Sequence, residues 1–463
     1  MEDIKLSIII PVYNEINTVL EIIRLVKEER HKKEIIVVDD CSTDGTHEVL
    51  KQIEEENIRV LFNDVNRGKG YGIRKALKYV AGDIVIIQDA DLEYYPDEYG
   101  ILIEKIIQNK ADVVYGSRFI GGAHRVFNFY HYIGNLVINT IANIFLNANF
   151  TDLMTCYKAF RSDVLKSLKL EANGFGIETE ITAEVFKRRY RVYEVPISYN
   201  GRTYEEGKKI RWTDFFTCLY WLLRSIIRGV DLGEDTLLKT IIMKNNNWWV
   251  YKKIEPFLGK KILELGSGIG AISKYLVKKN RKVTLTDINK KYTTYLKRRF
   301  VGNPHVEVKN IDILNIDTVF SEGEFDTIIG INILEHIEHD IESIKKLKKV
   351  LIKEGNLILL VPAHKSLFGK LDSKLGHFRR YSRDELKTKL KNEGFYIERI
   401  EFMNFLGAVG WFINFKLLRR ERMSKLVIQI FDGTIPVIAF IERFLKFPFG
   451  LYLLCIAKNK LDF

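Results

Sequence analysis

The sequence predicts an α/β protein built from two unlike domains. Short β-branched runs alternate with helical segments along the first half of the chain, and a second, different series of the same kind follows a polar stretch. Such alternation is typical of mostly parallel sheets with helices on both faces. The length of 463 residues also exceeds what one hydrophobic core usually serves, so more than one domain is expected.

The first series contains the apolar runs LSIII, EIIVVDD, IRVLF, DIVIIQDAD and ADVVYGS, with helix-like segments such as TVLEIIRLVKEER between them. Strands this apolar are typical of a sheet that is buried on both faces. The second series contains KKILELGSGIG, RKVTLTDIN, FDTIIGINILEHI and GNLILLVPAH. A polar segment with an asparagine triplet separates the two series. We expect a first domain over residues 1–231, a connector over 232–246, and a second domain over 247–463 with an apolar insertion near 402–447.

The net charge of +12 is typical of a protein with anionic partners, such as phosphorylated substrates, an anionic membrane surface or nucleic acid. The basic residues are spread over both domains without a nucleic-acid-binding motif, so no nucleic-acid partner is expected. Four scattered cysteines indicate a reducing compartment. The start, MEDIKLSIIIPVYNE, lacks the features of a signal peptide, and no apolar run is long enough to indicate a membrane span. We therefore expect a cytoplasmic location.

Acidic or amide side chains follow three apolar runs of the first series. They are Asn14 and Glu15, Asp39 and Asp40, and Asp89 and Asp91. Because such sheets bind ligands beyond the carboxyl ends of their strands, we expect these side chains at one edge. Asp89 and Asp91, two residues apart, can point to one cation, and Mg²⁺ or Mn²⁺ commonly bridges such acids to substrate phosphates. The alternative is that these acids are helix caps or loop residues.

The segments PVYNE, VVDDCSTDGT, NRGKGYGIRKAL, QDADLEYYPDE and YGSRF, in this order, resemble family 2 glycosyltransferases of the GT-A fold. The resemblance covers roughly residues 5–230 and is to the dolichol-phosphate mannose synthase and polyprenyl-phosphate glycosyltransferase type. It implies a nucleotide-sugar site formed by Pro11, Tyr13, Glu15, Asp39, Asp40, Lys69, Gly70, Asp89, Ala90, Lys208 and Lys209. It implies that Asp89 and Asp91 hold Mg²⁺ or Mn²⁺ on the diphosphate. The catalytic residues it implies are Asp89, Asp91, Arg118, Glu178, Glu180 and Arg202, with Arg125 and His131 toward the acceptor.

The implied reaction is an inverting transfer of a sugar from a UDP- or GDP-sugar to a polyprenyl or dolichyl phosphate. A phosphate acceptor is already an anion and needs no strong general base, whereas a hydroxyl acceptor needs one. Glu178 or Glu180 could be that base, or both could be favourable acids in the first turn of a helix. Cys156 stands where the family has a glycine. Arg202, Lys208 and Lys209 lie on a loop that closes over the diphosphate in the family, or that is simply solvated.

The second series begins with a glycine turn, LELGSGIG, and an acid, Asp287, follows about twenty residues later at the end of VTLTD. A glycine turn at a helix start with such an acid is typical of a nucleoside-binding site, including that of dinucleotide dehydrogenases. Together with NIDIL and FDTIIGINILEHI, it resembles a class I S-adenosylmethionine methyltransferase over roughly residues 247–400. The resemblance implies binding of S-adenosylmethionine by Glu264, Gly266, Ser267, Gly268, Asp287, Asp312 and Asn332.

Three basic residues are candidates for contacts to the methyl acceptor: His336, His377 and Arg379. His336 could act as a base or only support the site, and the segment with His377 and Arg379 could be a folded basic loop. We therefore expect a bifunctional enzyme, with methylation of the transferred sugar or its lipid as a hypothesis. The alternatives are transfer to a sugar or protein hydroxyl, and a methyltransferase-like domain that only binds its cofactor.

Two stretches combine apolar, aromatic and basic residues: WTDFFTCLYWLLRSIIRG and the insertion near 402–447. Such composition is typical of helices that lie in a membrane interface, although burial in the protein would explain it equally. We expect peripheral attachment to the cytoplasmic face of an anionic membrane, and the sequence leaves the oligomeric state open.

Overall fold

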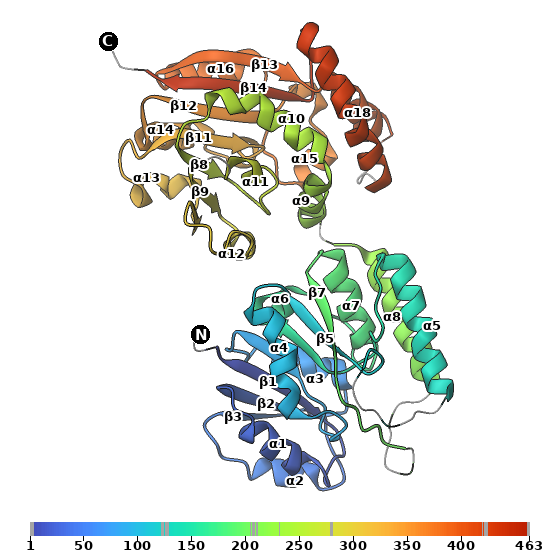
Figure 1. Ribbon diagram of the computed structural model, residues 1–463. Coiled ribbons are helices and arrows are strands. Elements are labelled where there is room, and N and C mark those ends of the chain that lie inside the picture. The colour runs from blue at the N-terminus through green and yellow to red at the C-terminus, as the bar shows by residue number, and fades with distance from the viewer. Residues whose placement is uncertain are drawn as a thin grey trace. The chain divides into compact units, whose positions relative to one another are not determined.

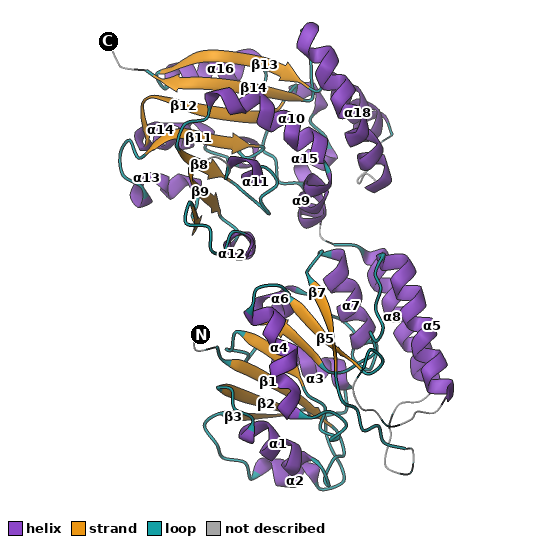
Figure 2. Ribbon diagram, in the orientation of Figure 1, coloured by secondary structure: helices purple, strands orange, loops and turns teal. Residues whose placement is uncertain are grey.

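The computed structural model describes residues 4–121, 125, 129–203, 205, 209, 212–230, 232–277, 281–418, 420 and 425–460 (Figure 1). The chain separates into two compact units, Met1–Val230 and Asp231–Phe463. Both units consist of a sheet covered by helices (Figure 2). The predicted fold class of two unlike α/β domains is confirmed.

The first unit is built on a seven-stranded sheet with the order β3-β2-β1-β4-β6-β5-β7. Its strands are β1 (Leu6–Val12), β2 (Lys33–Asp39), β3 (Ile58–Phe62), β4 (Ile84–Ile87), β5 (Val113–Ser117), β6 (Lys158–Arg161) and β7 (Val192–Pro196). All neighbours run parallel except β6, which is antiparallel to both β4 and β5. The central strand β1 therefore ends at the same edge as β2 and β4 on its two sides.

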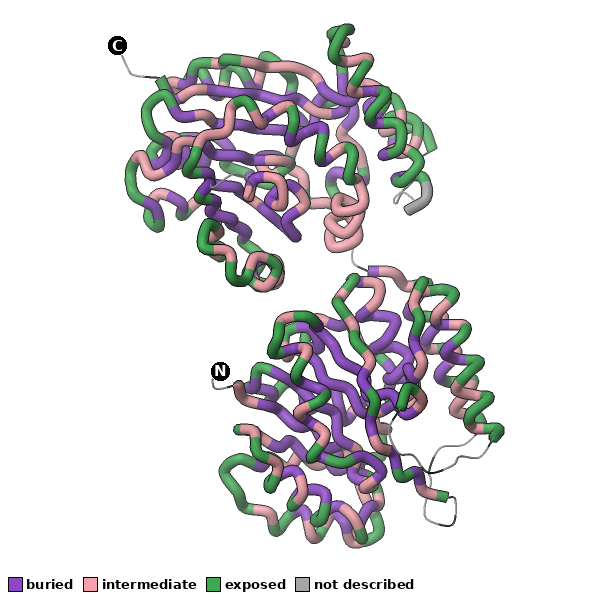
Figure 3. The backbone as a smooth tube through the Cα atoms, in the orientation of Figure 1, coloured by how far each residue is buried: buried purple, intermediate pink, exposed green. Residues whose placement is uncertain are grey.

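Both faces of this sheet are buried, as the apolar runs predict (Figure 3). Ile8 and Ile10 belong to one hydrophobic cluster and Ile9 to the other, because successive side chains of a strand point to opposite faces. One face is covered by α1 (Val19–Glu28), α2 (Thr46–Lys51) and α4 (Tyr99–Ile107), which follows the turn η1 (Pro96–Glu98). The other is covered by α3 (Lys69–Ala76), α5 (Phe129–Leu146), α6 (Ser162–Ser167), α7 (Ile177–Lys187) and α8 (Trp212–Arg228).

The second unit has its own seven-stranded sheet, with the order β10-β9-β8-β11-β12-β14-β13. Its strands are β8 (Lys261–Leu265), β9 (Lys282–Asp287), β10 (Val306–Asn310), β11 (Phe325–Ile331), β12 (Leu351–Pro362), β13 (Phe395–Met403) and β14 (Tyr452–Asn459). Only β14 is antiparallel to its neighbours. The carboxyl ends of the parallel strands β8, β9 and β11 therefore meet at one edge.

The helices of the second unit cover both faces of its sheet. They are α9 (Leu232–Ile242), α10 (Lys244–Ile254), α11 (Ser273–Leu276), α12 (Lys290–Arg299), α13 (Ile316–Val319), α14 (Asp340–Val350), α15 (Lys370–Lys374), α16 (Arg383–Asn392), α17 (Phe405–Trp411) and α18 (Lys425–Phe444). Shorter turns are η2 (Glu255–Phe257), η3 (Ile313–Asn315), η4 (Leu334–His336) and η5 (Lys365–Leu367), and η6 (Phe412–Leu417) is a π-helix.

The predicted connector over 232–246 is helical, since it forms α9 and the start of α10. Asp432 of α18 accepts hydrogen bonds from the backbone N–H groups of Asn245 and Asn246 at 3.1 and 2.9 Å, so α18 caps α10. The predicted apolar insertion forms α17, η6 and α18. Within the described residues, no helix is both long and apolar enough to cross a membrane.

Candidate active sites

Three strand ends bring acids to one edge of the first sheet. β2 and β4 flank β1 in parallel, with Val12 opposite Asp39 and Ile9 opposite Ile87, the last residue of β4. The segment that carries Asp89 and Asp91 therefore begins beside the segment that carries Glu15.

Lys69, at the start of α3, joins Asp89 to α7. Its Nζ donates a hydrogen bond to Asp89 Oδ1 at 2.6 Å and lies 3.4 Å from Glu178 Oε1. Glu178 also forms an ion pair with Lys158, whose side chain is completely buried. Although burial of Asp89 opposes its ionisation, the Lys69 ammonium holds the pKa of this carboxyl below its usual value. Two lysines and two acids thus alternate in one buried chain of charges.

Asp91 lies in a more acidic environment. Burial, together with the charges of Asp89 and Glu93, raises the pKa of Asp91 to about 8. Arg202 Nη2 lies 3.4 Å from Asp91 Oδ2 and donates to Glu15 Oε1 at 2.9 Å, while the Arg202 backbone N–H donates to Glu93 Oε1 at 2.7 Å. Asp89 and Asp91 offer the oxygen ligands that Mg²⁺ and Mn²⁺ prefer, and a divalent charge there would offset the repulsion that keeps Asp91 protonated. The residues therefore fit the metal that the resemblance implies.

The glycines of NRGKG allow a close approach that places Lys69. Gly68 has a φ of +92°, and a Cβ there would lie 2.6 Å from the carbonyl oxygen of Asn173. A Cβ on Gly70 would collide with the carbonyl oxygen of Ala172. The start of α3 is therefore pressed against the loop before α7, which brings Lys69 to Glu178.

The neighbouring carboxylates of Asp39 and Asp40 have different hydrogen-bond partners. Asp40 accepts hydrogen bonds from Asn63 Nδ2 at 2.7 Å and from the Gly68 backbone N–H at 2.6 Å, so it shapes the glycine loop. Asp39 Oδ2 lies 2.8 Å from Nδ1 of His47. Sequence reasoning did not single out His47, because a lone histidine in a short helix carries no signal of its own.

Arg118 pairs with an acid that is not one of the acids near the strand ends. Its Nε and Nη2 donate to the two carboxylate oxygens of Asp152 at 2.7 and 2.8 Å, and its guanidinium lies 5.0 Å from the ring centre of Tyr199. The Tyr199 hydroxyl donates to Glu93 Oε2 at 2.6 Å. Arg118 is thus separated from the acidic cluster by one tyrosine ring.

Glu180 serves a different purpose from Glu178. Its Oε2 accepts hydrogen bonds from the backbone N–H groups of Glu171 and Ala172 at 2.9 and 2.8 Å. This carboxylate therefore fastens the loop that the glycines approach.

The other predicted residues of this domain are dispersed around the cluster. Lys209 donates to Glu15 Oε1 at 2.6 Å, and Arg125 donates to the carbonyl oxygen of Gly201 at 3.1 Å, next to Arg202. Tyr13 is 37% exposed, Pro11 is partly buried in β1, Ala90 is buried, and His131 is partly buried on α5. Lys208 lies outside the described residues.

In the second domain, the glycine turn after β8 carries the predicted features of a nucleoside site. Gly266 and Gly268 have positive φ values of +58° and +52°. The Gly268 backbone N–H donates to Asp287 Oδ2 at 2.9 Å, which ties the turn to the end of β9. Glu264 accepts a hydrogen bond from Ser273 Oγ at 2.5 Å, and its burial raises its pKa to about 7.

A cavity of about 500 Å³ opens above this turn. Of the predicted residues, those that line it are Glu264, Gly266, Ser267, Asn332, His336 and His377. The described lining includes neither Gly268 nor Asp287, which bond to each other beside the turn. It also lacks Asp312, whose Oδ1 accepts a hydrogen bond from the Leu314 N–H at 2.9 Å, and Arg379, which pairs with Asp340 at 3.1 Å. Residues of α9, α10, α17 and α18 complete the cavity wall, which sequence reasoning did not foresee.

The comparisons with known proteins give a family for each domain. The family model for glycosyl transferase family 2 matches residues 7–169, and the model for a methyltransferase domain matches residues 263–359. An undecaprenyl-phosphate mannosyltransferase of Micrococcus luteus is 29% identical over 219 residues, which is 43% of this chain and 85% of that protein. A dolichol-phosphate mannosyltransferase of Pyrococcus furiosus is 30% identical, covering 44% of this chain but only 59% of that protein.

Two solved structures are similar at low sequence identity. Glucosyl-3-phosphoglycerate synthase of Mycobacterium tuberculosis is 20% identical with a TM-score of 0.39, covering 48% of this chain and 78% of that one. An S-adenosylmethionine-dependent methyltransferase of Archaeoglobus fulgidus is 16% identical with a TM-score of 0.32, covering 52% of this chain and 99% of that one. These scores are low, so neither structure decides a substrate. The family models and the mannosyltransferase relatives agree with both predicted resemblances, and the chain is an enzyme that joins a family 2 glycosyltransferase domain to a methyltransferase domain.

Proposed function

We propose that the first domain transfers a sugar from a UDP- or GDP-sugar to a polyprenyl phosphate, with inversion and with Mg²⁺ or Mn²⁺ at Asp89 and Asp91. The observation that carries this proposal is the set of acids and cations at the ends of β1, β2 and β4. The metal would act as a Lewis acid on the diphosphate leaving group. The names of the two mannosyltransferase relatives support a polyprenyl or dolichyl phosphate as the acceptor.

In the proposed sugar transfer, the side chains of the first domain would supply positive charge to the phosphate groups rather than a general base. Lys69 and Arg202 each contact a carboxylate of the cluster, so both are placed to turn to the donor phosphates once a metal neutralises Asp89 and Asp91. Arg118, whose guanidinium lies 5.0 Å from the ring centre of Tyr199, would face an anionic acceptor.

The two candidate bases support a phosphate acceptor over a hydroxyl. Glu178 is already paired with Lys69 and Lys158, and Glu180 accepts two backbone hydrogen bonds. Although burial raises the pKa of Glu180, its carboxylate is engaged with the backbone and Glu178 is engaged with two lysines, and an anionic phosphate acceptor requires no base.

The test is transfer of labelled sugar into the lipid phase by the purified chain. The protein is incubated with Mg²⁺ or Mn²⁺, polyprenyl phosphate and each nucleotide sugar in turn. We expect lipid label from one donor, lost on removal of the metal and in Asp91→Ala. No lipid label from any donor, with label appearing instead on a soluble hydroxyl acceptor, would refute the proposed acceptor.

We propose that the second domain transfers a methyl group from S-adenosylmethionine. Glu264, Gly266, Ser267 and Asp287 would bind the donor, since the positive-φ glycines and the buried acids fit a nucleoside and an amino acid. The sulfonium methyl group would supply the chemistry, and the residues of the cavity would orient the acceptor. Asn332 at the end of β11 would lie between donor and acceptor.

The cavity supports an acceptor with an apolar part. Beyond Asn332 it is lined by Leu371, Phe415, Ile428 and Phe431, and by Trp411, whose buried Nε1 has no hydrogen-bond partner among the described residues. A lipid-linked sugar offers both an apolar chain and a polar group for that N–H. The methyl acceptor would then be the product of the first domain.

We also propose peripheral attachment to an anionic membrane surface. The α5 and α8 helices pack together and expose Tyr130, Phe145, Trp212 and Ile227, each more than half exposed. Aromatic and aliphatic side chains on such a helix pair are typical of a membrane interface. Co-sedimentation with anionic vesicles tests this: Trp212→Ser should weaken binding, and equal binding by wild type and variant would count against it.

A further inference from the structure

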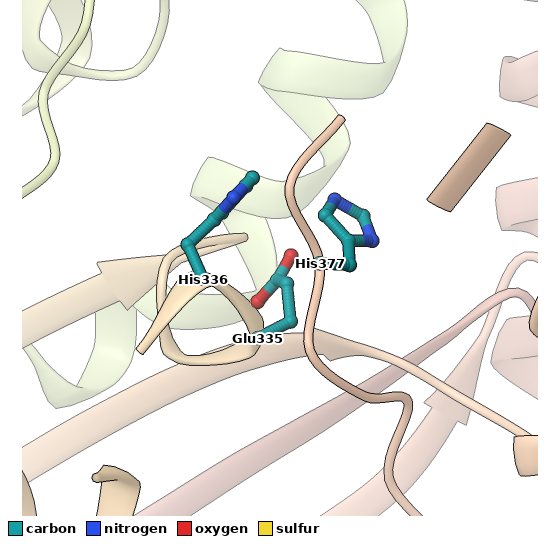
Figure 4. Close-up of side chains that lie close together, drawn as sticks. All are labelled: Glu335, His336 and His377. Atoms are coloured by element: carbon teal, nitrogen blue, oxygen red, sulfur yellow. The ribbon is translucent and has the colours of Figure 1, made fainter. Parts of the chain in front are cut away.

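The cavity of the second domain contains a cluster of three potential metal ligands. Glu335 and His336 belong to η4, directly after β11, and His377 follows α15 (Figure 4). One ligand atom from each residue lies within 4.8 Å of the other two. The two imidazole rings are perpendicular, with centres 4.6 Å apart, and the three side chains in Figure 4 surround a common space.

Glu335 is the anomaly of this cluster. Its side chain is fully buried, yet neither carboxylate oxygen has a hydrogen-bond partner on another described residue. A buried acid without partners costs folding free energy, which a bound cation would recover. The nearby guanidinium of Arg380 lowers the pKa of Glu335 by its charge, but its Nε donates its hydrogen bond to Asp372 at 2.9 Å rather than to Glu335.

His377 is oriented as metal-binding histidines usually are. Its Nδ1 lies 3.1 Å from Oδ1 of Asp372, a fully buried carboxylate that also accepts a hydrogen bond from the Gly369 backbone N–H at 2.9 Å. A carboxylate behind a histidine fixes the ring and its tautomer, which would leave the Nε2 lone pair of His377 available to a metal ion. Asp372, itself held by the backbone, therefore keeps the His377 ring in a fixed orientation within the cluster.

We propose that Glu335, His336 and His377 bind a divalent transition-metal ion that holds an oxygen of the methyl acceptor. Two imidazoles with one carboxylate favour Mn²⁺, Fe²⁺, Co²⁺ or Zn²⁺ over Mg²⁺ or Ca²⁺. Three protein ligands leave coordination positions open for substrate, as in catalytic sites. The inference rests on the proposed methyl transfer and specifies its acceptor as a molecule with a hydroxyl group.

The transfer balances without a further reagent. The acceptor hydroxyl loses its proton to solvent, and an electron pair on its oxygen forms the new bond to the methyl carbon. The pair of the broken carbon–sulfur bond stays on sulfur, which becomes a neutral thioether. The ion would favour the deprotonated oxygen and direct it to the methyl group.

The experiment titrates the metal-free full-length protein with Mn²⁺ and records the spin-echo modulation from coordinated ¹⁴N. Asp91→Asn, which weakens the carboxylate site of the first domain, serves as the background. We compare Glu335→Gln, His377→Gln and Asp372→Asn with His305→Gln, an exposed histidine that serves as the matched control. Calorimetric binding of S-adenosylhomocysteine shows whether each variant keeps its donor site.

We expect nitrogen-coupled Mn²⁺ in the background protein and in His305→Gln. Glu335→Gln and His377→Gln should lose it while still binding S-adenosylhomocysteine, and Asp372→Asn should bind the ion roughly 10- to 100-fold more weakly. No nitrogen coupling in the background protein, or coupling that survives in both ligand variants, would overturn the metal site. Failure of the wild type to bind S-adenosylhomocysteine would instead overturn the proposed methyl transfer, because the nitrogen signal is read without it.

Discussion

Buried carboxylates of the two domains differ in what neutralises them. Glu178 of the first domain is paired with Lys69 and Lys158. Glu264 and Glu335 of the second have pKa values raised to about 7 and 8, because burial outweighs the charges of Arg299 near Glu264 and of Arg380 near Glu335. The first pattern holds for Glu178 but not for Asp91 of the same domain, whose pKa is raised to about 8. The second suits a site that receives its positive charge from a ligand.

Replacing Glu178 by Gln should therefore destabilise the first domain. Lys158 is completely buried, so the change leaves its charge without compensation, at a cost of about 3–5 kcal/mol of unfolding free energy. Denaturant unfolding followed by intrinsic fluorescence measures this. Glu180→Gln is the matched control, since a neutral amide oxygen still accepts the N–H groups of Glu171 and Ala172 and the loss should be near 1 kcal/mol. Equal losses in the two variants would contradict the assignment.

The raised pKa of Glu264 predicts a pH dependence of stability. Between the usual pKa of 4.5 and the folded value of about 7, the folded state keeps a proton that the unfolded state has lost. The contribution of Glu264 to the stability of the second domain should therefore be fully present below pH 4.5 and be lost as the pH rises through about 7, a change of at most about 3 kcal/mol. Calorimetry can follow the transition that S-adenosylhomocysteine shifts upward. Glu264→Gln should flatten this dependence, and an unchanged slope in that variant would disprove the cause.

At the residue scale, the sequence predicts the site residues that stand in short motifs, but it does not predict residues that only the folded chain brings together. Asp89, Asp91, Glu264 and the glycine turn stand in local patterns, and the structure places them at the edges of their sheets. Lys158 has no motif around it, because its partner Glu178 is twenty residues away on another element. Such long-range contacts follow only from packing.

At the element scale, the strands were the most predictable and the helix α9 the least. The apolar runs of β-branched residues in the sequence coincide closely with the observed strands, because a sheet that is buried on both faces requires apolar side chains along its strands. The sequence of α9 predicts a polar connector, but its residues Thr236, Leu237 and Thr240 line the cavity of the second domain. Its polar composition reflects a helix that lies over a ligand cavity rather than in a core.

We predict that ligand binding at the glycine turn stabilises α9. Leu237 approaches Gly268, since a Cβ on that glycine would lie 3.1 Å from its side chain, and Glu234 pairs with Lys291 at 2.7 Å. S-adenosylhomocysteine in the cavity would bury one side of α9, so its local opening should become less favourable. Hydrogen exchange of residues 232–242 should slow on addition of the ligand, while exchange in α16, outside the cavity lining, should not change. Equal exchange in α9 with and without ligand would exclude it as a cover of the site.

At the scale of the whole molecule, each domain carries a complete sheet with its own site, which is why each family could be identified from its own motifs. The proposed common substrate of the two sites has no such motif. The features that favour it are Arg118 of the first domain, as the proposed contact to an anionic acceptor, and the apolar cavity wall of the second. A lipid that first receives a sugar and then a methyl group satisfies both.

That order of reactions predicts a dependence of one activity on the other. With polyprenyl phosphate and labelled S-adenosylmethionine, the wild-type chain should methylate lipid only when the nucleotide sugar is also present, because the acceptor hydroxyl belongs to the transferred sugar. Asp91→Ala should lose both activities, and lipid already glycosylated by the wild type should restore its methylation. His377→Gln should still transfer sugar but not methylate the restored substrate. Methyl label in lipid without nucleotide sugar, or on the nucleotide sugar itself, would show that the second domain acts on a different acceptor.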